Sequence, residues 1–383
     1  MQRKHSEAHR GLFLVDNKGD APLPSAIAGS SIGIIGSGNT GLALACYLSN
    51  QQHAVSILTR DKQKVQALSK FKQIGAEGRL EGSFPIQGIT SDAEPFCASS
   101  EIIFVATVAT AYRQVITNLI PHLRSGHKIV LFSSKFGGSL EVAKMIEDAG
   151  VKGVSVVETD ALFACRAQAD DYVAIKGIKQ WTLFSAPKKS STKQSAKFIQ
   201  QFFPDLEEAD NVIQRGITDF GAVAHPVTML VNMNPIDRQE PFLFYVDGFT
   251  EKTVLLLEQM EKDFRSVAEA YDTSLIPMHE LLKRYYGCED CCLYNAIRTV
   301  PAYQTITAPS TLDHRYISED VACTLVPLQQ LAQKANVKTP MIDSVINIAT
   351  ILSGVDLSQS GRTLAKLGWA DKTHKDIIRL INE

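Results

Sequence analysis

The feature that most constrains the fold of this chain is the glycine-rich segment Gly36-Ser37-Gly38-Asn39-Thr40-Gly41. It follows the short β-branched run 31–35 and precedes apolar residues at helical spacing, so it lies between a predicted strand and a predicted helix. In that context GxGxxG is typical of a dinucleotide-binding turn. The first glycine permits the tight turn, the second lets a pyrophosphate approach the backbone, and the third allows close packing of helix on strand. The order of elements disfavours the competing interpretation, a glycine-rich turn without a ligand.

Strand and helix patterns alternate after this turn. The sequence predicts strands at 54–58, 101–108, 128–132 and 154–158, and helices at 61–72, 111–123 and 140–149. The strand at 101–108 lacks polar alternation, as expected in a parallel sheet that is covered on both faces. The pattern predicts an α/β fold, with a Rossmann-type doubly wound sheet over 31–209 as the dinucleotide-binding domain. Residues 1–30 form a predicted N-terminal tail.

The pattern changes in the second half of the chain. Residues 163–186 are strand-like and predict an antiparallel extension of the sheet, and the polar segment 187–197 predicts a surface loop before a helix at 194–203. Strand signals fade after about residue 210, and helical periodicity then dominates. The predicted helices are 249–271, 274–286, 319–335, 340–352 and 374–382. We therefore expect an all-α C-terminal domain over 210–383, with a substrate site between the two domains.

The composition excludes several classes of function. In 383 residues, 39 Lys and Arg stand against 41 Asp and Glu, a net charge of −2. That balance supplies no basic patch for nucleic acid or an anionic membrane. No apolar run reaches the roughly 20 residues that span a bilayer. The first residues lack the apolar stretch of a signal peptide, so we expect a cytoplasmic protein that binds small molecules. The sequence leaves the oligomeric state open, with a homodimer as the candidate.

The seven cysteines predict no metal site. Cys288, Cys291 and Cys292 form a CEDCC cluster, and a Cys-x-x-Cys pair can hold zinc. A structural zinc site requires four ligands, however, and no second pair has metal-ligand spacing. We expect three reduced thiols near the border of a helix and a loop.

The residues after the second predicted strand indicate the type of cofactor. An enzyme that prefers NAD usually carries an acidic residue there, which accepts hydrogen bonds from the ribose. This chain has Thr59 and Arg60 near that position. A hydroxyl and a guanidinium suit the 2′-phosphate of NADP, so NADP is the predicted cofactor. Asp61 follows directly and keeps NAD as an alternative if the strand ends later.

His225 is the candidate catalytic residue of the second domain. It lies in an otherwise apolar stretch, 221–232, and shares a helical face with Asn232, seven residues further on. Pro226 is tolerated in a first helical turn, which predicts that His225 lies near a helix start. The helix dipole would then lower the pKa of His225. The alternative is a buried histidine with a purely structural role.

A second candidate segment is Arg315-Tyr316-Ile317-Ser318-Glu319-Asp320. Ser318 is a predicted helix N-cap, which would place both acids in a first turn that favours negative charge. That is a sufficient structural reason for the two carboxylates. The functional alternative is that a carboxylate orients a histidine for acid–base work, while Arg315 binds a substrate carboxylate.

Together these segments resemble the opine dehydrogenases, the octopine/nopaline dehydrogenase family, in five motifs that follow the same order from about residue 31. The motifs are GSGNTGLALACYL, the pair VET and FACR, AHPVTMLVN, RYISEDVACTLVP and GRTLAKLG. The resemblance implies that His225 is the catalytic acid or base and that Asp320 is its partner. It further implies that Arg315 binds the keto-acid carboxylate. Asn232, on the same helical face as His225, is a further candidate for substrate binding.

The implied reaction is a reductive condensation. An α-keto acid of the pyruvate or 2-oxoglutarate type forms an imine with the amine of an amino acid, and NAD(P)H reduces that imine. The chain departs from the family pattern at 51–53, at Ser133-Ser134-Lys135-Phe136 and at Ala322-Cys323-Thr324. Two alternatives stay open: an NADP-dependent reductase of 2-keto acids that needs no amine, and a protein that binds NADP(H) without turnover.

Overall fold

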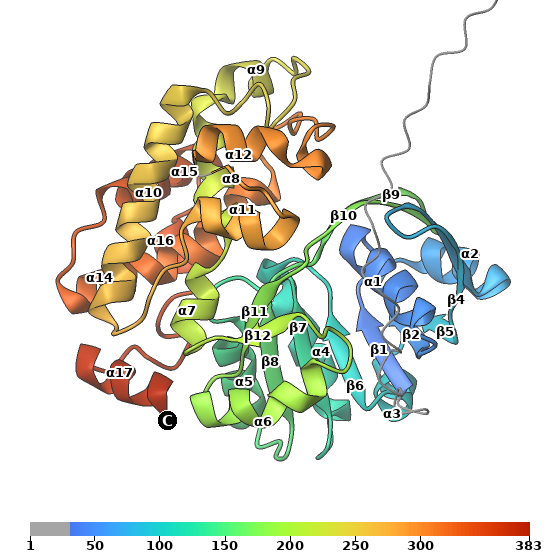
Figure 1. The fold of residues 1–383 in the computed structure, drawn as a ribbon. Coiled ribbons are helices and arrows are strands. Elements are labelled where there is room, and N and C mark those ends of the chain that lie inside the picture. Colours follow the sequence, from blue (N-terminus) through green and yellow to red (C-terminus); the bar gives the residue numbers. More distant parts are fainter. Residues whose placement is uncertain (1–30, 291) are drawn as a thin grey trace, which may run out of the picture.

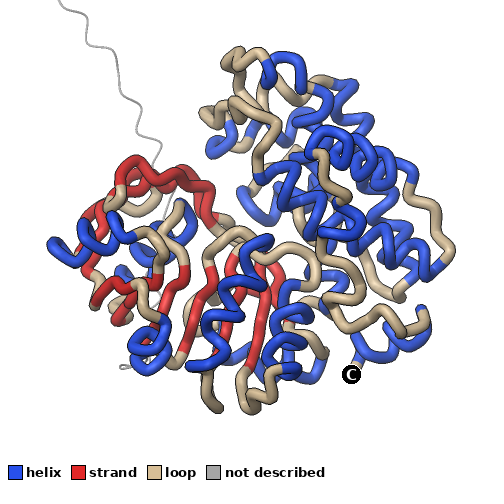
Figure 2. Tube along the Cα trace, turned by 180° about the vertical axis from the view of Figure 1, so that it is seen from behind, coloured by secondary structure: helices blue, strands red, loops and turns tan. Residues whose placement is uncertain are grey.

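The computed structural model describes residues 31–290 and 292–383, so the predicted tail at 1–30 and Cys291 lie outside the described residues. Figure 1 shows two lobes that meet along one side. Strands are confined to the first lobe, and the second contains helices and loops (Figure 2). We call them the sheet lobe (β1–β12) and the helical lobe (α7–α17). The predicted fold class, a Rossmann-type sheet followed by a helical domain, is confirmed.

The main sheet of the sheet lobe has the strand order β12-β11-β8-β7-β6-β1-β2-β5. The six strands from β8 to β5 are parallel, β11 is antiparallel to β8, and β12 is parallel to β11. The strands are β1 (Ser31–Ile35), β2 (Ala54–Leu58), β5 (Gly88–Thr90), β6 (Ile102–Val105), β7 (Lys128–Phe132), β8 (Ser155–Thr159), β11 (Thr182–Ser185) and β12 (Leu206–Glu208). The order reverses between β1 and β6, where doubly wound sheets bind their ligands.

The helices of the sheet lobe connect successive strands. They are α1 (Asn39–Asn50), α2 (Lys62–Phe71), α3 (Ala93–Ser99), α4 (Tyr112–Leu119), α5 (Gly138–Asp148) and α6 (Lys189–Ile199). The expectation of a loop at 187–197 is wrong, because α6 covers most of it. Thr192 and Ile199 are buried while the lysines of α6 point to solvent, so the polar composition reflects one exposed helix face.

A second sheet of four strands lies beside the first, in the order β4-β3-β10-β9. Its strands are β3 (Gln73–Gly78), β4 (Gly82–Pro85), β9 (Phe163–Ala169) and β10 (Tyr172–Ile178). The predicted antiparallel extension is therefore correct only for β11. In Figure 1, β9 and β10 cross the top of the sheet lobe toward the helical lobe. The backbone N–H of Ala167 in β9 donates to Asn39 Oδ1 (2.9 Å), which ties this sheet to the glycine-rich turn.

The helical lobe contains α7 (Val212–Ile217), α8 (Phe220–Val231), α9 (Met233–Asp237), α10 (Glu251–Ala270), α11 (Met278–Tyr286), α12 (Leu293–Thr299), α13 (Arg315–Asp320), α14 (Val326–Ala335), α15 (Pro340–Ser353), α16 (Leu357–Ser360) and α17 (His374–Asn382). A π-helical segment, Val321–Leu325, joins α13 to α14 without a break. No helix within the described residues is both long and apolar enough to cross a membrane.

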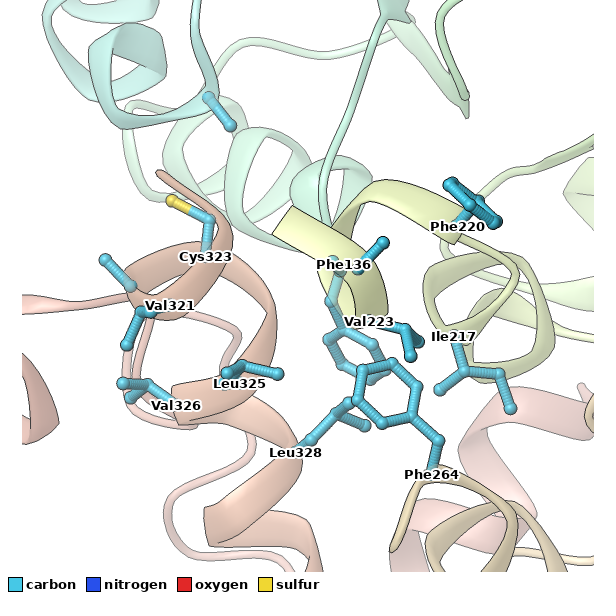
Figure 3. Close-up of a cluster of buried hydrophobic side chains, with 14 of the residues drawn as sticks. Phe136, Ile217, Phe220, Val223, Phe264, Val321, Cys323, Leu325, Val326 and Leu328 are labelled. Carbon is cyan, nitrogen blue, oxygen red and sulfur yellow. The ribbon is translucent and has the colours of Figure 1, made fainter. Parts of the chain in front are cut away.

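One hydrophobic core extends across the contact between the lobes. Phe136, from the loop after β7, is fully buried among helical-lobe side chains that include Val223, Phe264 and Leu328 (Figure 3). Gly216 in α7 makes room for it, because a Cβ there would lie 2.4 Å from the Phe136 ring. The lobes are therefore packed together, and the loop after β7 has a fixed position against the helices.

Candidate active site

The glycine-rich turn has the geometry that a pyrophosphate requires. Gly36 has φ +107°, which side-chain-bearing residues rarely adopt, and a Cβ on Gly41 would lie 2.0 Å from the Gly36 carbonyl oxygen. A Cβ on Gly38 would meet no atom within 4 Å, so the space beside this backbone is open. Gly38 caps α1 without any side-chain hydrogen bond to the first helical turn. A dinucleotide fits this cradle, with its phosphates on the N–H groups at the α1 N-terminus.

The residues after β2 leave no carboxylate facing this cradle. β2 ends at Leu58, and the Asp61 carboxylate accepts hydrogen bonds from the backbone N–H groups of Gln63 and Lys64 as the N-cap of α2. The Thr59 and Ser37 hydroxyls hydrogen-bond each other (2.7 Å), and both residues are buried. Arg60 is exposed, where its guanidinium donates to Gln114 Oε1 (2.7 Å). Lys64, which the sequence analysis did not select, donates its ammonium to the Ser37 carbonyl (2.7 Å).

His225 and Asp320, 95 residues apart in the sequence, lie together in the helical lobe. His225 Nδ1 is 2.9 Å from Asp320 Oδ2, and His225 Nε2 is 2.8 Å from the Tyr245 hydroxyl. The Tyr316 ring stacks on the imidazole with centroids 3.7 Å apart. Gly221, one turn earlier in α8, makes room for the imidazole, because a Cβ there would lie 2.7 Å from His225 Cε1. Contacts at both nitrogens and on the ring face fix the orientation of the imidazole.

Lys135 connects this pair to the sheet lobe. Its Nζ lies 2.5 Å from Asp320 Oδ1 and 2.8 Å from Asp219 Oδ2. All three side chains are buried, with at most 10% of each exposed. Asp219 also accepts a hydrogen bond from the Ala222 N–H as the N-cap of α8, the helix that carries His225. The cluster therefore combines two carboxylates, one ammonium and one imidazole in the interior of the protein.

Burial and these neighbours shift the proton affinities of the cluster. Burial lowers the pKa of His225, and its hydrogen bond to Asp320 works in the opposite direction. Burial favours the neutral carboxyl of Asp320, but Lys135 and His225 hold the pKa of that carboxyl well below its ordinary value. Burial likewise opposes the charge of Lys135, and the two aspartates raise its pKa nevertheless. Asp320 and Lys135 are therefore both charged at neutral pH.

Two predicted helix starts are wrong. α8 begins at Phe220, capped by Asp219, so His225 lies in the middle of the helix with Pro226 inside it. α13 begins at Arg315, where Nδ1 of the N-cap His314 accepts from the Tyr316 N–H, so Ser318 is not the cap. The acids at 319 and 320 consequently lie beyond the first turn of a helix that continues through the π-helical segment, where the helix dipole contributes little. Specific partners stabilise these carboxylates instead.

Glu319 and Arg315 lie beside the cluster, whereas Asn232 does not. Glu319 Oε1 accepts from the backbone N–H of Ala109 in the sheet lobe (2.6 Å). The half-exposed Arg315 guanidinium lies 3.7 Å from the other Glu319 oxygen and lines the cleft described below. The structure places Asn232, predicted to bind substrate, at the far end of α8 and away from the cleft. Its amide donates to the backbone carbonyls of Thr228 and Gly248, and it is not among the cleft residues.

A cleft of about 880 Å³ between the lobes joins the glycine-rich turn to the His225 cluster. The residues that directly follow four parallel strands line it: Gly36 after β1, Ala106 after β6, Ser133 after β7 and Asp160 after β8. These are the carboxyl ends at which a doubly wound sheet binds its ligands. From the opposite side the cleft is lined by His225, Tyr245, Arg315 and Tyr316. A dinucleotide on the turn and a small molecule at His225 would therefore share one space.

Four members of the cluster were not predicted from the sequence: Lys135, Asp219, Tyr245 and Tyr316. Asp219 carried a readable signal, since an aspartate before an apolar helix is a typical N-cap. Lys135 was noticed only as a departure from the family pattern. Tyr316 lies in the candidate segment 315–320 but has no predicted role there, and nothing in the chain around Tyr245 marks it, because only the tertiary fold brings these side chains to His225.

The described part of the chain contains no group of three or more His, Cys, Asp or Glu side chains that could hold a metal ion. Cys288 is buried and Cys292 is exposed. The third cysteine of the predicted cluster, Cys291, lies outside the described residues.

Comparison with known proteins links both lobes to oxidoreductases. Residues 208–353 match the profile described as NAD/NADP octopine/nopaline dehydrogenase, alpha-helical domain, and residues 31–135 match that of NADP oxidoreductase, coenzyme F420-dependent. The chain is 30% identical over 349 residues to the opine dehydrogenase of Arthrobacter sp. (strain 1C), over 91% of this chain and 97% of that relative. It is 23% identical over 363 residues to the vitopine synthase of Allorhizobium ampelinum, over 92% and 99% of the two chains.

Solved structures show the same fold. Octopine dehydrogenase in complex with NADH and agmatine superposes with a TM-score of 0.73 at 19% identity, covering 91% of this chain and 98% of that one. Yersinopine dehydrogenase with NADP⁺ bound superposes with a TM-score of 0.64 at 14% identity, covering 92% and 97%.

Proposed function

The chain belongs to the opine dehydrogenase family, and from that premise we propose how its residues carry out the reaction. The protein is an NAD(P)-dependent oxidoreductase that acts on CH–NH bonds, through the reductive condensation of an α-keto acid with an amino group. One observation carries the proposed site: the His225–Asp320 pair lies in the same cleft as the glycine-rich turn. His225 is the proposed acid or base, Asp320 its partner, and Arg315 the residue that binds the keto-acid carboxylate.

The proposed steps balance as follows. The amine nitrogen attacks the keto carbon, and loss of water leaves an imine. A proton on the imine nitrogen makes its carbon electrophilic, and the bound nicotinamide supplies the hydride that reduces it. His225 exchanges the required proton at Nε2, which the Tyr245 hydroxyl contacts in this structure. Asp320 at Nδ1 stabilises the protonated imidazole, and Arg315 orients the keto acid so that its reacting carbon faces the nicotinamide.

NADP is the proposed preferred cofactor. Arg60 and Lys64 offer two cations near the end of β2, whereas the Asp61 carboxylate is engaged at the α2 N-terminus. A 2′-phosphate gains charge-assisted hydrogen bonds from such cations, and a ribose without a phosphate does not. Solved relatives with NADH and with NADP⁺ both exist, so the family alone does not decide between them. Kinetic constants for NADPH and NADH, measured side by side, test this preference.

The proposed substrates are an α-keto acid of the pyruvate or 2-oxoglutarate type and the amine of an amino acid. We propose a cytoplasmic location, which the six described cysteines support because none of them forms a disulfide. A homodimer stays a prediction, and the mass of the protein in solution tests it.

The decisive experiment follows NADPH oxidation with a panel of α-keto acids, each with and without pooled amino acids. We expect turnover only when both substrates are present, and dividing the pool then identifies the amine. Turnover with the keto acid alone would favour the alternative, a simple keto-acid reductase. NADPH binding without any turnover would favour the other alternative, a protein that binds NADP(H) without catalysis, or an amine outside the pool.

A further inference from the structure

Lys135 is a buried cation to which the reaction described above assigns no role. It lies in the loop after β7, and Phe136, the next residue, is anchored in the helical lobe against Gly216. This loop also departs from the pattern of the family that the chain otherwise resembles. A lysine is rarely buried without a specific reason, since its ammonium loses water that its partners must replace.

Both partners of Lys135 act on His225 by separate routes. Asp320 uses one oxygen for Lys135 (2.5 Å) and the other for His225 Nδ1 (2.9 Å), so its carboxylate lies between the ammonium and the imidazole. Asp219 contacts Lys135 (2.8 Å) and caps the helix that carries His225. The acids belong to the helical lobe and the lysine to the sheet lobe.

The charges of this cluster depend on Lys135. With His225 neutral, two carboxylates and one ammonium leave a charge of −1, and protonation of His225 brings the total to zero. Without the ammonium, two negative charges would face the imidazole, and each would favour its protonated form. Lys135 therefore lowers the pKa of His225. Asp219 reduces this effect, because its carboxylate shares the ammonium of Lys135 with Asp320.

Other charged or titratable groups near the cluster are already engaged or lie at its edge. Glu319 pairs with the Ala109 N–H and Arg315, and Asp160 pairs with Lys179. The remaining groups are Arg315, which is half exposed, His314, Tyr245 and Tyr316. Burial raises the pKa of both tyrosines and lowers that of His314 to about 4, so these three are neutral near pH 7. Within the described residues, Lys135 is the buried cation that contacts Asp320 directly.

We propose that Lys135 is a positioning residue: it holds Asp320 in place, offsets its charge, and so sets the pH range in which His225 exchanges its proton. This proposal rests on the proposed function, since it assumes that His225 is the acid or base. It adds a residue from the sheet lobe to a catalytic pair that otherwise comes from the helical lobe. The group of Lys135, Asp320 and His225 is then complete only when the two lobes are packed together.

The test is the pH profile of kcat/KM for oxidation of the secondary amine product. The acidic limb of this profile reports the pKa of His225 in the free enzyme, because oxidation requires the neutral imidazole as base. Lys135→Met should move the limb to higher pH by about one unit, since the unopposed Asp320 charge favours the imidazolium. Asp219→Asn should move it to lower pH, because Lys135 then acts on Asp320 alone. Asparagine still caps α8, so this variant keeps the helix start.

The control is Lys135→Arg, which keeps the charge and should leave the limb in place even if kcat falls. Limbs that stay unchanged in both Lys135→Met and Asp219→Asn would overturn the proposal, as would shifts of the same sign. If Lys135→Met does not fold, the Asp219→Asn shift alone decides. NMR titration of the His225 imidazole without substrates separates the two claims. If the pKa of His225 rises in Lys135→Met and falls in Asp219→Asn, the Lys135 proposal is supported. If the same protein turns over no combination of keto acid and amine, the proposed function is refuted independently.

Discussion

The glycine-rich turn and the His225 cluster line the same cleft, yet they are constructed in opposite ways. The turn occupies six consecutive residues, and its constraints, such as the close approach of Gly41 to the Gly36 carbonyl, arise within that segment. The cluster takes Lys135 from the sheet lobe, His225 from α8, Tyr245 from a loop and Asp320 from α13. A local site can be recognised in a sequence, whereas an assembled site depends on contacts that only the fold provides. If the two sites are also functionally separate, a substitution in the cluster should leave NADPH affinity unchanged, and a substitution in the turn should leave the pKa of His225 unchanged.

The largest expected effect is that of His225→Ala. Loss of the acid or base should reduce kcat by about 10³-fold, in the middle of the range for such groups, and leave NADPH affinity nearly unchanged. Stopped-flow turnover and a fluorescence titration of NADPH give the two numbers. A variant that no longer binds NADPH would show that the two sites are not separate.

Gly221→Ala should have the next largest effect, although it removes no polar group of the cluster. The new Cβ would lie 2.7 Å from His225 Cε1, and Tyr316 stacks on the ring, so the imidazole must shift from its present position between Asp320 and Tyr245. We expect a loss of about 10²-fold in kcat, the size that a small misplacement of a reacting group produces. Gly88→Ala is the matched control, because a Cβ there meets no atom within 4 Å. Equal activity of the two variants would contradict the steric argument.

Gly41→Ala examines the other side of the comparison. Its Cβ would lie 2.0 Å from the Gly36 carbonyl oxygen, so the turn must open and α1 must shift from β1. NADPH affinity should fall by about tenfold or more, equivalent to about 1.4 kcal/mol, while the pH limb assigned to His225 stays in place. Calorimetric titration of NADPH and the pH profile of kcat/KM check both statements. A displaced limb would mean that the turn supports the distant cluster.

The smallest effect concerns the choice between cofactors. Arg60→Ala should raise the KM for NADPH by about tenfold and leave that for NADH nearly unchanged, as expected for one charge-assisted hydrogen bond to a 2′-phosphate. Lys64→Ala should act in the same direction. Equal losses with the two cofactors would refute the role of Arg60 at the 2′-phosphate.

The sequence predicted the parts of the fold whose signals are local. The parallel strands and the order of lobes follow from apolar runs and from the turn between β1 and α1, and the structure confirms them. Predictions failed where one signal had two interpretations. The polar residues of the exposed face of α6 have the composition of a loop. Ser318 is a residue type that often caps a helix, but His314 is the N-cap of α13. Pro226 is typical of a first helical turn, but α8 begins earlier, at Phe220.

The site was predictable only in part, for the same reason. His225 and Asp320 were selected from a resemblance, since nothing in their spacing of 95 residues reveals a 2.9 Å contact. Asn232 shares a helical face with His225, but helical periodicity does not show that the cleft ends before it. Lys135 carried no chemical signal in the sequence, because its partners lie 84 and 185 residues further along the chain.

The contact between the lobes also limits how such a chain can be recombined. Phe136 fills the space that Gly216 leaves, and the fully buried Arg362, near the end of the chain, pairs with Glu141 (2.8 Å) and donates to the Phe136 carbonyl (3.0 Å). A chimaera that joined this sheet lobe to the helical lobe of a distant relative would keep Phe136 and Glu141 but lose the Gly216 and Arg362 that fit them, unless the relative carries the same residues. We therefore expect substrate preference to change more readily through substitutions in the cleft walls than through exchange of a whole lobe.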